Sequence, residues 1–350
     1  MKHVYSDVIT FTGNHYDFGY MQGELLKSSP ILANRQNQSA SRRKHHFTID
    51  EEKSVELLTT LIPGMIDELR GLADALQMNS TEALREFGGY YMEYTRSGCS
   101  ILTGSSYMIR NYDSHPAGYE GRYLLYQPTD AGYATMGPSG QITGRLDGMN
   151  EKGLAVGFNF INRLGSADGF ICAMITRILL ETCANVEEAV TLIKEIPHRT
   201  SFSYVLLDSS GISYVVEASP RSVAVRKNHI STNHFEMLTE ENRYHMADSL
   251  RRQQLLGNQA REATVVNSYR LLNDTDKEVF SNKYGAASGT LHTAVYLPEE
   301  RKAWFAIGGD RNPVIFDFNR FLQGEKINIK QIKGTIEYEQ GFLNQEIFGG

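Results

Sequence analysis

The sequence predicts an α+β protein in which two β-sheets pack face to face between helical layers, a four-layer αββα sandwich. Residues 12–91 carry mostly helical spacing of apolar residues, whereas the chain from Cys99 onward is rich in short apolar runs typical of strands. Two helix pairs, at residues 169–196 and 240–275, interrupt these strands. This order favours two sheets between helices over an alternating βαβ arrangement.

The N-terminal residues are expected to form one strand and then a helix. Residues 1–13 alternate apolar and polar side chains like a strand, and they lack the continuous apolar stretch of a secretory signal. Residues 14–29 have the pattern of a helix despite two glycines, Gly19 and Gly23. Glycines spaced four apart lie on one helix face, so they would allow a neighbouring element to pack closely.

The helical pattern continues over residues 50–76 and 81–91. Pro63 is the only interruption of the first stretch, and Ser80 or Thr81 would cap the helix of the second. Residues up to this point are therefore predicted to be mostly helical.

The sharpest boundary in the chain lies at residues 96–99, where helical spacing gives way to strands. Short turns join several of the strands that follow. The predicted strands are residues 99–104, 107–113, 122–128, 154–160, 203–210, 212–219, 222–228, 293–298 and 302–309.

Composition narrows the classes of partner and compartment. The net charge of −6 comes from interspersed charges of both signs, so we expect no nucleic acid partner. No apolar run approaches the roughly 18 residues that a membrane-spanning helix needs, so no membrane is expected. Three cysteines without a C-x-x-C motif indicate neither a disulfide framework nor a zinc knuckle. We therefore expect a cytoplasmic protein with no cofactor and no metal.

Cys99 directly follows Gly98 at the boundary between the helical segment and the first predicted strand. Taken alone, such a cysteine is a small apolar residue at the start of a strand. Arg110 and Asp113 change this interpretation, because a hairpin with the next strand would bring a cation and a carboxylate beside the sulfur. A plain Arg–Asp ion pair is the alternative.

Two asparagines complete the candidate site. Asn233 lies in the sequence STNHF, after a strand and before a helix, where its side-chain amide could be held at the end of a sheet and donate to an oxyanion. A helix-capping role is the alternative for this residue. Asn159 lies at the end of DGMNEKGLAVGFNF, residues 147–160, which is a good hairpin and indicates no function by its physics alone.

The motifs GCS, RNYD, GMNEKGLAVGFNF and STNHF, in this order, resemble the choloylglycine hydrolase and penicillin acylase superfamily of N-terminal nucleophile hydrolases. The helical segment before the cysteine and the sequence GYMQG resemble its acyl-coenzyme A:6-aminopenicillanic acid acyltransferase branch, which is made as a proenzyme. The resemblance covers nearly the whole chain. It implies an αββα sandwich and autocatalytic cleavage between Gly98 and Cys99. Two associated fragments would result, a mostly helical pro-segment of residues 1–98 and a catalytic domain of residues 99–350.

The resemblance also implies roles for the site residues. Cys99 matches the nucleophile, Arg110 and Asp113 match the pair beside it, Asn233 matches the side-chain oxyanion donor, and Asn159 matches the strand residue that lines the same oxyanion hole.

One family position has no clear match. The bile-salt branch has a later active-site arginine, and the corresponding region near SGTLHTAVY contains His292 instead, which weakens a bile-acid assignment. Cleavage would free the α-amino group of Cys99, which titrates near pH 8 and can serve as the general base for the thiol. For cleavage itself, Gly98 would permit a strained backbone that other residues resist.

The predicted activity is hydrolysis of the carbon–nitrogen bond of a small acyl amide through an acyl-cysteine intermediate. Acyl transfer from an amide or thioester to an amine stays open, with acyl-coenzyme A as one candidate donor, because both reactions pass through the same acyl-enzyme. A homo-oligomer is compatible with the sequence.

Two other classes of function are alternatives. A metal-dependent hydrolase would use His229, His234 and His245, but their spacing matches no helical zinc pair. A binding protein would keep the fold and never cleave itself.

Overall fold

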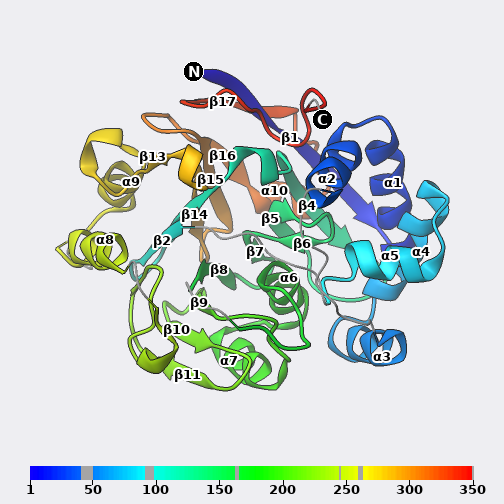
Figure 1. The fold of residues 1–350 in the computed structure, drawn as a ribbon, viewed down its shortest axis with the longest axis horizontal. Coiled ribbons are helices and arrows are strands. Elements are labelled where there is room, and N and C mark those ends of the chain that lie inside the picture. Colours follow the sequence, from blue (N-terminus) through cyan, green and yellow to red (C-terminus); the bar gives the residue numbers. More distant parts are fainter. Residues whose placement is uncertain (41–49, 91–97, 162–164, 244–245, 259–262, 349–350) are drawn as a thin grey trace.

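A computed structural model describes residues 1–40, 50–90, 98–161, 165–243, 246–258 and 263–348 (Figure 1). Two β-sheets face each other, and helices cover the outer side of each, so the predicted αββα sandwich is confirmed. Residues 96 and 97 of the predicted boundary lie outside the described residues, as do parts of the predicted helical stretch 240–275.

The larger sheet has ten strands in the order β11-β10-β9-β8-β7-β5-β4-β1-β17, with β6 paired to β5. Its strands are β1 (Lys2–Gly13), β4 (Arg122–Pro128), β5 (Thr135–Gly140), β6 (Gly144–Arg145), β7 (Asp147–Asn150), β8 (Ala155–Phe160), β9 (Phe202–Leu207), β10 (Ser213–Ala218), β11 (Val223–Arg226) and β17 (Gln331–Ile336).

The smaller sheet has seven strands in the order β12-β2-β3-β14-β15-β16, with β13 paired to β14. Its strands are β2 (Gly98–Thr103), β3 (Met108–Ser114), β12 (Ile230–Ser231), β13 (Asn282–Lys283), β14 (Ser288–Leu297), β15 (Lys302–Ile307) and β16 (Val314–Asp317). All nine strands predicted from residue 99 onward are present, the strand predicted at residues 1–13 is β1, and β7 is the first strand of the hairpin predicted at residues 147–160. Strands β5, β16 and β17 are among those that the sequence pattern did not indicate.

Both predicted helix pairs are confirmed, and they form the outer layers. Helices α6 (Cys172–Thr182) and α7 (Val186–Glu195) pack on the larger sheet, whereas α8 (Ala247–Gly257) and α9 (Val265–Asn273) pack on the smaller one. Figure 1 shows α8 and α9, in yellow, on the side of the molecule away from the N-terminal helices. The remaining short helical elements are η1 (Pro116–Gly118), η2 (Thr239–Glu241), η3 (Thr275–Lys277), η4 (Tyr284–Ala286) and α10 (Phe318–Leu322).

The N-terminal helices, blue to cyan in Figure 1, gather at one side of the sandwich. The sequence pattern missed α2 and placed the cap of α5 wrongly. Asn79, and not Ser80 or Thr81, caps α5: its Oδ1 accepts from the backbone N–H of Glu82 at 2.8 Å, and the Glu82 carboxylate accepts from the Asn79 N–H at 3.2 Å. The helices are α1 (His15–Lys27), α2 (Ile31–Ala40), α3 (Glu51–Leu61), α4 (Met65–Leu76) and α5 (Ser80–Phe87).

The predicted close packing at Gly19 and Gly23 is confirmed, because α1 lies directly against α4. A Cβ atom on Gly19 would lie 2.0 Å from the carbonyl oxygen of Glu68, and one on Gly23 would lie 2.5 Å from the Cβ of Ala75. Such distances leave no room for a side chain. The two helix backbones can approach this closely only because glycine has none.

Alanine at Gly71 of α4 is expected to destabilise the fold, because its Cβ would lie 2.1 Å from the carbonyl oxygen of Tyr16 on α1. The helices would have to move apart, so the free energy of unfolding should fall by roughly 1–3 kcal/mol, although alanine favours a helix by about 1 kcal/mol. Chemical denaturation measures the change. Gly285→Ala is the control, because nothing lies within 4 Å of that position. Equal stability of the two variants would contradict the prediction.

Strand β1 joins the N-terminal residues to the larger sheet. It pairs in parallel with β4 over Asp7–Gly13 and antiparallel with β17 over Lys2–Asp7. The first strand of the chain therefore lies inside the sheet, and β17 forms its edge beyond β1. Residues 1–98 thus contribute to the same sheet as β4 to β11.

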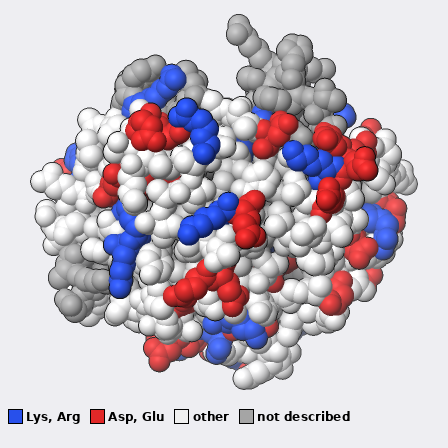
Figure 2. Space-filling model, turned by 90° about the horizontal axis from the view of Figure 1, so that it is seen from below, with Lys and Arg blue, Asp and Glu red and all other residues white. Residues whose placement is uncertain are grey.

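Charged side chains of both signs intermix over the face shown in Figure 2, without a broad area of one sign. In the part of the chain that the structure describes, no helix is both long enough and apolar enough to span a bilayer.

Candidate active site

Cys99 and Arg110 come together because β2 and β3 form an antiparallel hairpin. In this register Cys99 lies opposite Tyr112, and Gly98 lies opposite Asp113. Arg110 Nη2 donates a hydrogen bond to Cys99 Sγ at 3.4 Å. The hairpin therefore brings a cation to the sulfur, as the sequence predicts.

The thiol of Cys99 is closed off from solvent, with an exposed fraction of 0%. Burial raises the pKa of this thiol, and the nearby Arg110 guanidinium opposes that effect only in part. The carboxylate of Asp113 raises the thiol pKa further. Cys99 is therefore a buried thiol whose protonated form is favoured.

Arg110 is held from several directions. Its Nη1 donates to Asp147 Oδ2 at 2.7 Å, and its Nη2 donates to the carbonyl oxygen of Phe158 at 2.6 Å. Its Cζ lies 4.8 Å from the ring centre of Tyr112 and 4.5 Å from that of Phe158. Burial opposes the charge of Asp147, but His292 and Arg110 together lower the pKa of this carboxyl to about 2.

The side-chain oxygen of Asn233 accepts a hydrogen bond from the backbone of Cys99. The Cys99 N–H donates to Asn233 Oδ1 at 3.0 Å, whereas Asn233 Nδ2 donates to the carbonyl oxygen of Phe160 at 2.8 Å. A second arginine, Arg252, donates through Nη2 to the same Asn233 oxygen at 2.7 Å and through Nη1 to the Cys99 carbonyl oxygen at 2.6 Å. The nitrogen and the carbonyl of Cys99 are thus both held by side chains.

Arg252 is not among the predicted site residues, because the resemblance places a second arginine only near residues 288–296. Arg252 lies on α8, is 5% exposed, and donates through Nε to Asp248 Oδ2 at 2.8 Å. Its neighbour Arg251 pairs with Asp248 as well, at 3.1 Å, but at the surface. An Asp and an Arg four apart on a helix were the available signal. Which of the two arginines turns inward depends on how α8 packs.

Asn159 joins the site through a neighbour and not through Cys99 itself. It is fully buried on β8, and its Nδ2 donates to Ser231 Oγ at 3.0 Å. Ser231 lies on β12, two residues before Asn233. Among the described residues, Asn159 Oδ1 has no hydrogen-bond partner. The side chain therefore presents a buried acceptor next to the segment that carries Asn233.

Asp113 lies beside Gly98. A Cβ on Gly98 would be 3.3 Å from Asp113 Oδ2, which is tighter than an ordinary contact. Gly98 itself is part of the extended strand β2 and does not have a positive φ. Its lack of a side chain allows the close approach of Asp113. Burial raises the pKa of Asp113 to about 6, although Arg252 and a hydrogen bond from Thr290 at 2.7 Å favour the charged form.

The raised pKa of Asp113 predicts a pH-dependent stability of the uncut chain. Its folded value of about 6 exceeds the unfolded value of about 3.9, so this contribution to stability is full below about pH 3.9 and is lost as the pH rises through about 6. In a Cys99→Ala background, Asp113→Asn should lose this dependence and gain up to about 3 kcal/mol at about pH 7.5 relative to about pH 3.5. Denaturation at both pH values measures it, with the exposed Asp276→Asn as control. A pH dependence identical in all variants would contradict the prediction.

The metal-dependent alternative would need His229, His234 and His245 as ligands. His234 Nδ1 hydrogen-bonds Ser249 Oγ at 2.8 Å, and His245 lies outside the described residues. Across the ranges that the structure describes, no three His, Cys, Asp or Glu side chains gather closely enough to hold a metal ion.

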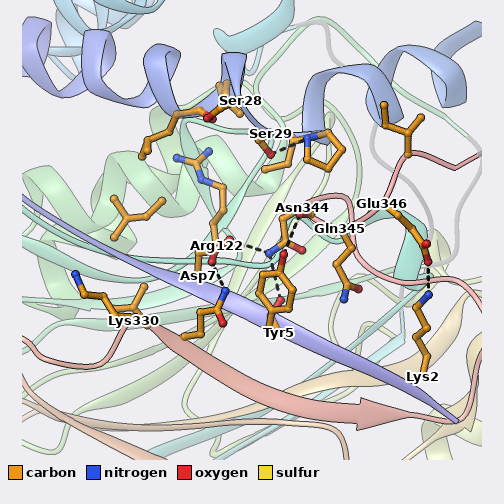
Figure 3. A pocket seen from close by; sticks show the side chains of 18 residues that line it. Lys2, Tyr5, Asp7, Ser28, Ser29, Arg122, Lys330, Asn344, Gln345 and Glu346 are labelled. Atoms are coloured by element: carbon orange, nitrogen blue, oxygen red, sulfur yellow. Dashed lines mark hydrogen bonds and ion pairs between the residues drawn. The ribbon is translucent and has the colours of Figure 1, made fainter.

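A cavity of about 1010 Å³ lies elsewhere, between the start of β1, the junction of α1 and α2, and residues 344–347 (Figure 3). Lys2 pairs with Glu346 and Asn344 donates to Asp7 Oδ2 along its wall. Cys99 is not among the residues that line it. The candidate site therefore rests on the contacts around Cys99 and not on the size of a cavity.

Comparisons with known proteins give one family and several structures. The model of the acyl-coenzyme A:6-aminopenicillanic acid acyl-transferase family matches residues 102–312. This region begins just after Cys99 and includes Arg110, Asp113, Asn159 and Asn233. No curated protein matches the chain.

Three of the solved structures that are similar to the chain show how distant the likeness is. Penicillin V acylase from Agrobacterium tumefaciens is 17% identical, with a TM-score of 0.44 over 64% of this chain and 86% of that one. A mutant of conjugated bile acid hydrolase from Clostridium perfringens is 15% identical, with a TM-score of 0.45 over 70% and 98%. An N-acylethanolamine-hydrolyzing acid amidase ortholog from Caenorhabditis elegans is 14% identical, with a TM-score of 0.36 over 58% and 93%.

Proposed function

The chain belongs to the acyl-coenzyme A:6-aminopenicillanic acid acyl-transferase family, whose model matches more than half of its 350 residues. On this premise we propose that it is a self-processing amidohydrolase. Cys99 is its nucleophile, and small acyl amides are its substrates. The contacts of Cys99 carry the proposal, because the sulfur meets Arg110 at 3.4 Å while the backbone nitrogen meets Asn233 at 3.0 Å.

Self-cleavage would begin with attack of Cys99 Sγ on the carbonyl carbon of Gly98. The S–C bond forms, the bond from that carbon to the Cys99 nitrogen breaks, and the nitrogen takes up the thiol proton. Water then hydrolyses the thioester, leaving a carboxylate on Gly98 and a free thiol and amine on Cys99. Arg252 supports this step, because it holds the Cys99 carbonyl at 2.6 Å beside the bond that breaks.

After cleavage, the nitrogen of Cys99 is an amine that can accept the proton of its own thiol. Its place next to Asn233 Oδ1 would orient the amine toward the sulfur. Asp113 would assist from the opposite strand, and Arg110 would favour the thiolate. The sulfur then attacks the acyl carbon of an amide, the amine product leaves with a proton, and water releases the acid.

The oxyanion donors require one rearrangement of the uncut site. Asn233 Nδ2 is bonded to the Phe160 carbonyl in the uncut chain, so donation to an oxyanion would require this amide to share or exchange that bond. Asn159 lies one contact away, through Ser231. Asn233 keeps its proposed role as the side-chain donor, and Asn159 lines the hole with a backbone N–H nearby as the second donor. Loss of one donor typically costs about 3–4 kcal/mol of barrier.

The two fragments should stay associated after cleavage, because a buried ion network crosses between them. Glu68 of α4 meets Arg177 of α6 at 2.7 Å, and both side chains are 0% exposed. Arg177 also pairs with Glu181, and His15 of α1 contacts Glu181 at 3.4 Å and Asp130 at 2.7 Å. The pairing of β1 with β4 and β17 adds a backbone connection.

The experiment that tests the activity supplies the processed protein with a panel of N-acyl amides. Released amine and acyl-Cys99 are followed by mass spectrometry, with Cys99→Ala as the inactive control. Adding a second amine, or an acyl-coenzyme A donor, tests the acyltransferase alternative that the family name favours. Products that partition to the added amine would establish transfer. A processed protein that never forms acyl-Cys99 with any donor would overturn the proposal.

A further inference from the structure

A line of buried polar groups leads away from the nucleophile behind Arg110. Asp147 of β7 and His292 of β14 are both 0% exposed. Asp147 Oδ2 accepts from Arg110 Nη1 at 2.7 Å and is 2.9 Å from His292 Nε2. His292 Nδ1 lies 2.8 Å from the hydroxyl of Tyr119. From Cys99 Sγ the line therefore runs through Arg110, Asp147 and His292 to Tyr119.

The donor and the acceptor of each hydrogen bond along this line can be assigned in one way only. An ionised carboxylate such as Asp147 only accepts hydrogen bonds, so His292 must carry its hydrogen on Nε2. Burial lowers the pKa of His292, and the ring is then neutral, with Nδ1 as an acceptor. The hydroxyl of Tyr119 therefore donates to Nδ1. Each group fixes the tautomer or orientation of the next.

A register shift in β14 orients the side chain of His292 toward Asp147. The pairing of β14 with β3 shifts register between Thr290 and His292, so that Thr290 lies opposite Asp113 and His292 lies opposite Tyr112. Bulges of this kind re-aim side chains and are common beside active sites. Because of this shift, two residues of β14 contact two different carboxylates. Thr290 donates to Asp113 at 2.7 Å, and His292 contacts Asp147.

One aromatic ring packs on both His292 and Arg110. The ring of Tyr112 stacks on that of His292 with centres 5.2 Å apart and planes 14° apart. It also lies 4.8 Å from the Cζ of Arg110. A change in the position of His292 therefore reaches Arg110 through packing as well as through Asp147.

We propose that His292 and Tyr119 are positioning residues, which hold Asp147 and thereby fix the Arg110 guanidinium against Cys99 Sγ. The inference rests on the proposed function, in which the thiolate of Cys99 attacks the acyl carbon. The other charged groups around Cys99 are Asp113 and Arg252, and neither belongs to this line. Loss of His292 should therefore change the thiol through Arg110 alone.

The test measures the proton affinity of the thiol directly. The S–H stretching band of Cys99, taken as the Raman difference between each protein and the same protein with Cys99→Ala, is followed as a function of pH in wild type, His292→Leu and His292→Gln, because this readout needs no reagent to reach the buried thiol. Without a donor from residue 292, Asp147 keeps the hydrogen bond from Tyr296 to Oδ1 but loses the one to Oδ2, the oxygen that also accepts from Arg110. The guanidinium is then held less firmly, and the pH midpoint should rise by about one unit. His292→Gln retains an N–H that can reach Asp147, so its midpoint should stay within a few tenths of a unit of wild type.

The matched control is His198→Leu. His198 is also a buried histidine, but its Nε2 bonds the carbonyl oxygen of Ile193 at 2.8 Å and not the line behind Arg110. Its midpoint should equal that of wild type. With a substrate in hand, His292→Leu should also lower kcat roughly tenfold with little change in KM, because the thiolate and not substrate binding is affected.

An unchanged midpoint in folded His292→Leu overturns the proposal. If that variant does not fold, Tyr119→Phe decides, since it removes only one hydroxyl: a smaller upward shift supports the proposal, and no shift overturns it. Wild-type protein that hydrolyses no amide would count against the proposed function alone, because the S–H band of Cys99 can be measured without a substrate and in cut or uncut protein.

Discussion

Cys99→Ala protein is expected to remain one chain of residues 1–350, whereas wild type should give two fragments under denaturing conditions. The larger fragment should begin with Cys-Ser-Ile-Leu. Alanine has no atom that can attack the Gly98 carbonyl, so cleavage should fall below detection and not merely slow down. Intact mass and N-terminal sequencing measure both outcomes.

Cys183→Ala is the matched control for this experiment. Cys183 is a buried cysteine next to α6, with no part in the candidate site, and its variant should be cut like wild type. Cleavage of Cys99→Ala at the same bond would exclude the sulfur as the attacking group. An uncut wild type would leave the Cys99 amine blocked in a peptide bond, and the mechanism would have to be abandoned.

Arg177→Met should produce the largest loss of stability. Arg177 lies between Glu68 and Glu181, and all three side chains are at most 1% exposed. Removing the cation takes away the arginine that these two buried carboxylates share, leaving Gln22 beside Glu68 and His15 beside Glu181, and breaking a buried ion pair in this way typically costs about 3–5 kcal/mol. Denaturation of the uncut Cys99→Ala background measures the loss. In the processed protein, the same change should weaken the hold between the fragments, which size exclusion chromatography would reveal.

Two further variants make the interpretation of this loss specific. Arg320→Met removes an arginine that is 63% exposed and pairs with Glu325, which is 43% exposed, and it should cost no more than about 1 kcal/mol. Neutralising the carboxylates as well, in a triple variant with Glu68→Gln and Glu181→Gln, should restore part of the stability lost in Arg177→Met. A triple variant less stable than Arg177→Met would contradict this account.

The sequence could predict those parts of the fold that depend on local pattern. Alternation and helical spacing placed nine strands and both helix pairs, because burial of one face imposes these periods. The hairpin that joins Cys99 to Arg110 followed from two adjacent strands and a short turn. The order of strands in the larger sheet could not follow in the same way, because β1 pairs with a strand more than 300 residues away.

The candidate site also contains residues that a local sequence pattern could not predict. Arg252, Asp147 and His292 were not assigned to it, although each is buried and hydrogen-bonded close to Cys99 or Arg110. Their places depend on the packing of α8, on the pairing of β7 across the larger sheet, and on a register shift in β14. None of these features can be predicted from a short sequence motif. The direction in which the Asn233 amide turns is likewise set by the Phe160 carbonyl and Arg252.

The position of β1 between β4 and β17 also bears on when the chain can mature. The edge strand β17 ends at Ile336, so the larger sheet cannot be completed until almost the whole chain has left the ribosome. Contacts of such long sequence separation form slowly, and they form far more readily while both partners are covalently linked. Scission at Gly98 would remove that linkage for good. Fragments once separated should therefore rejoin poorly, and the durability of the mature form should be governed by its unfolding rate.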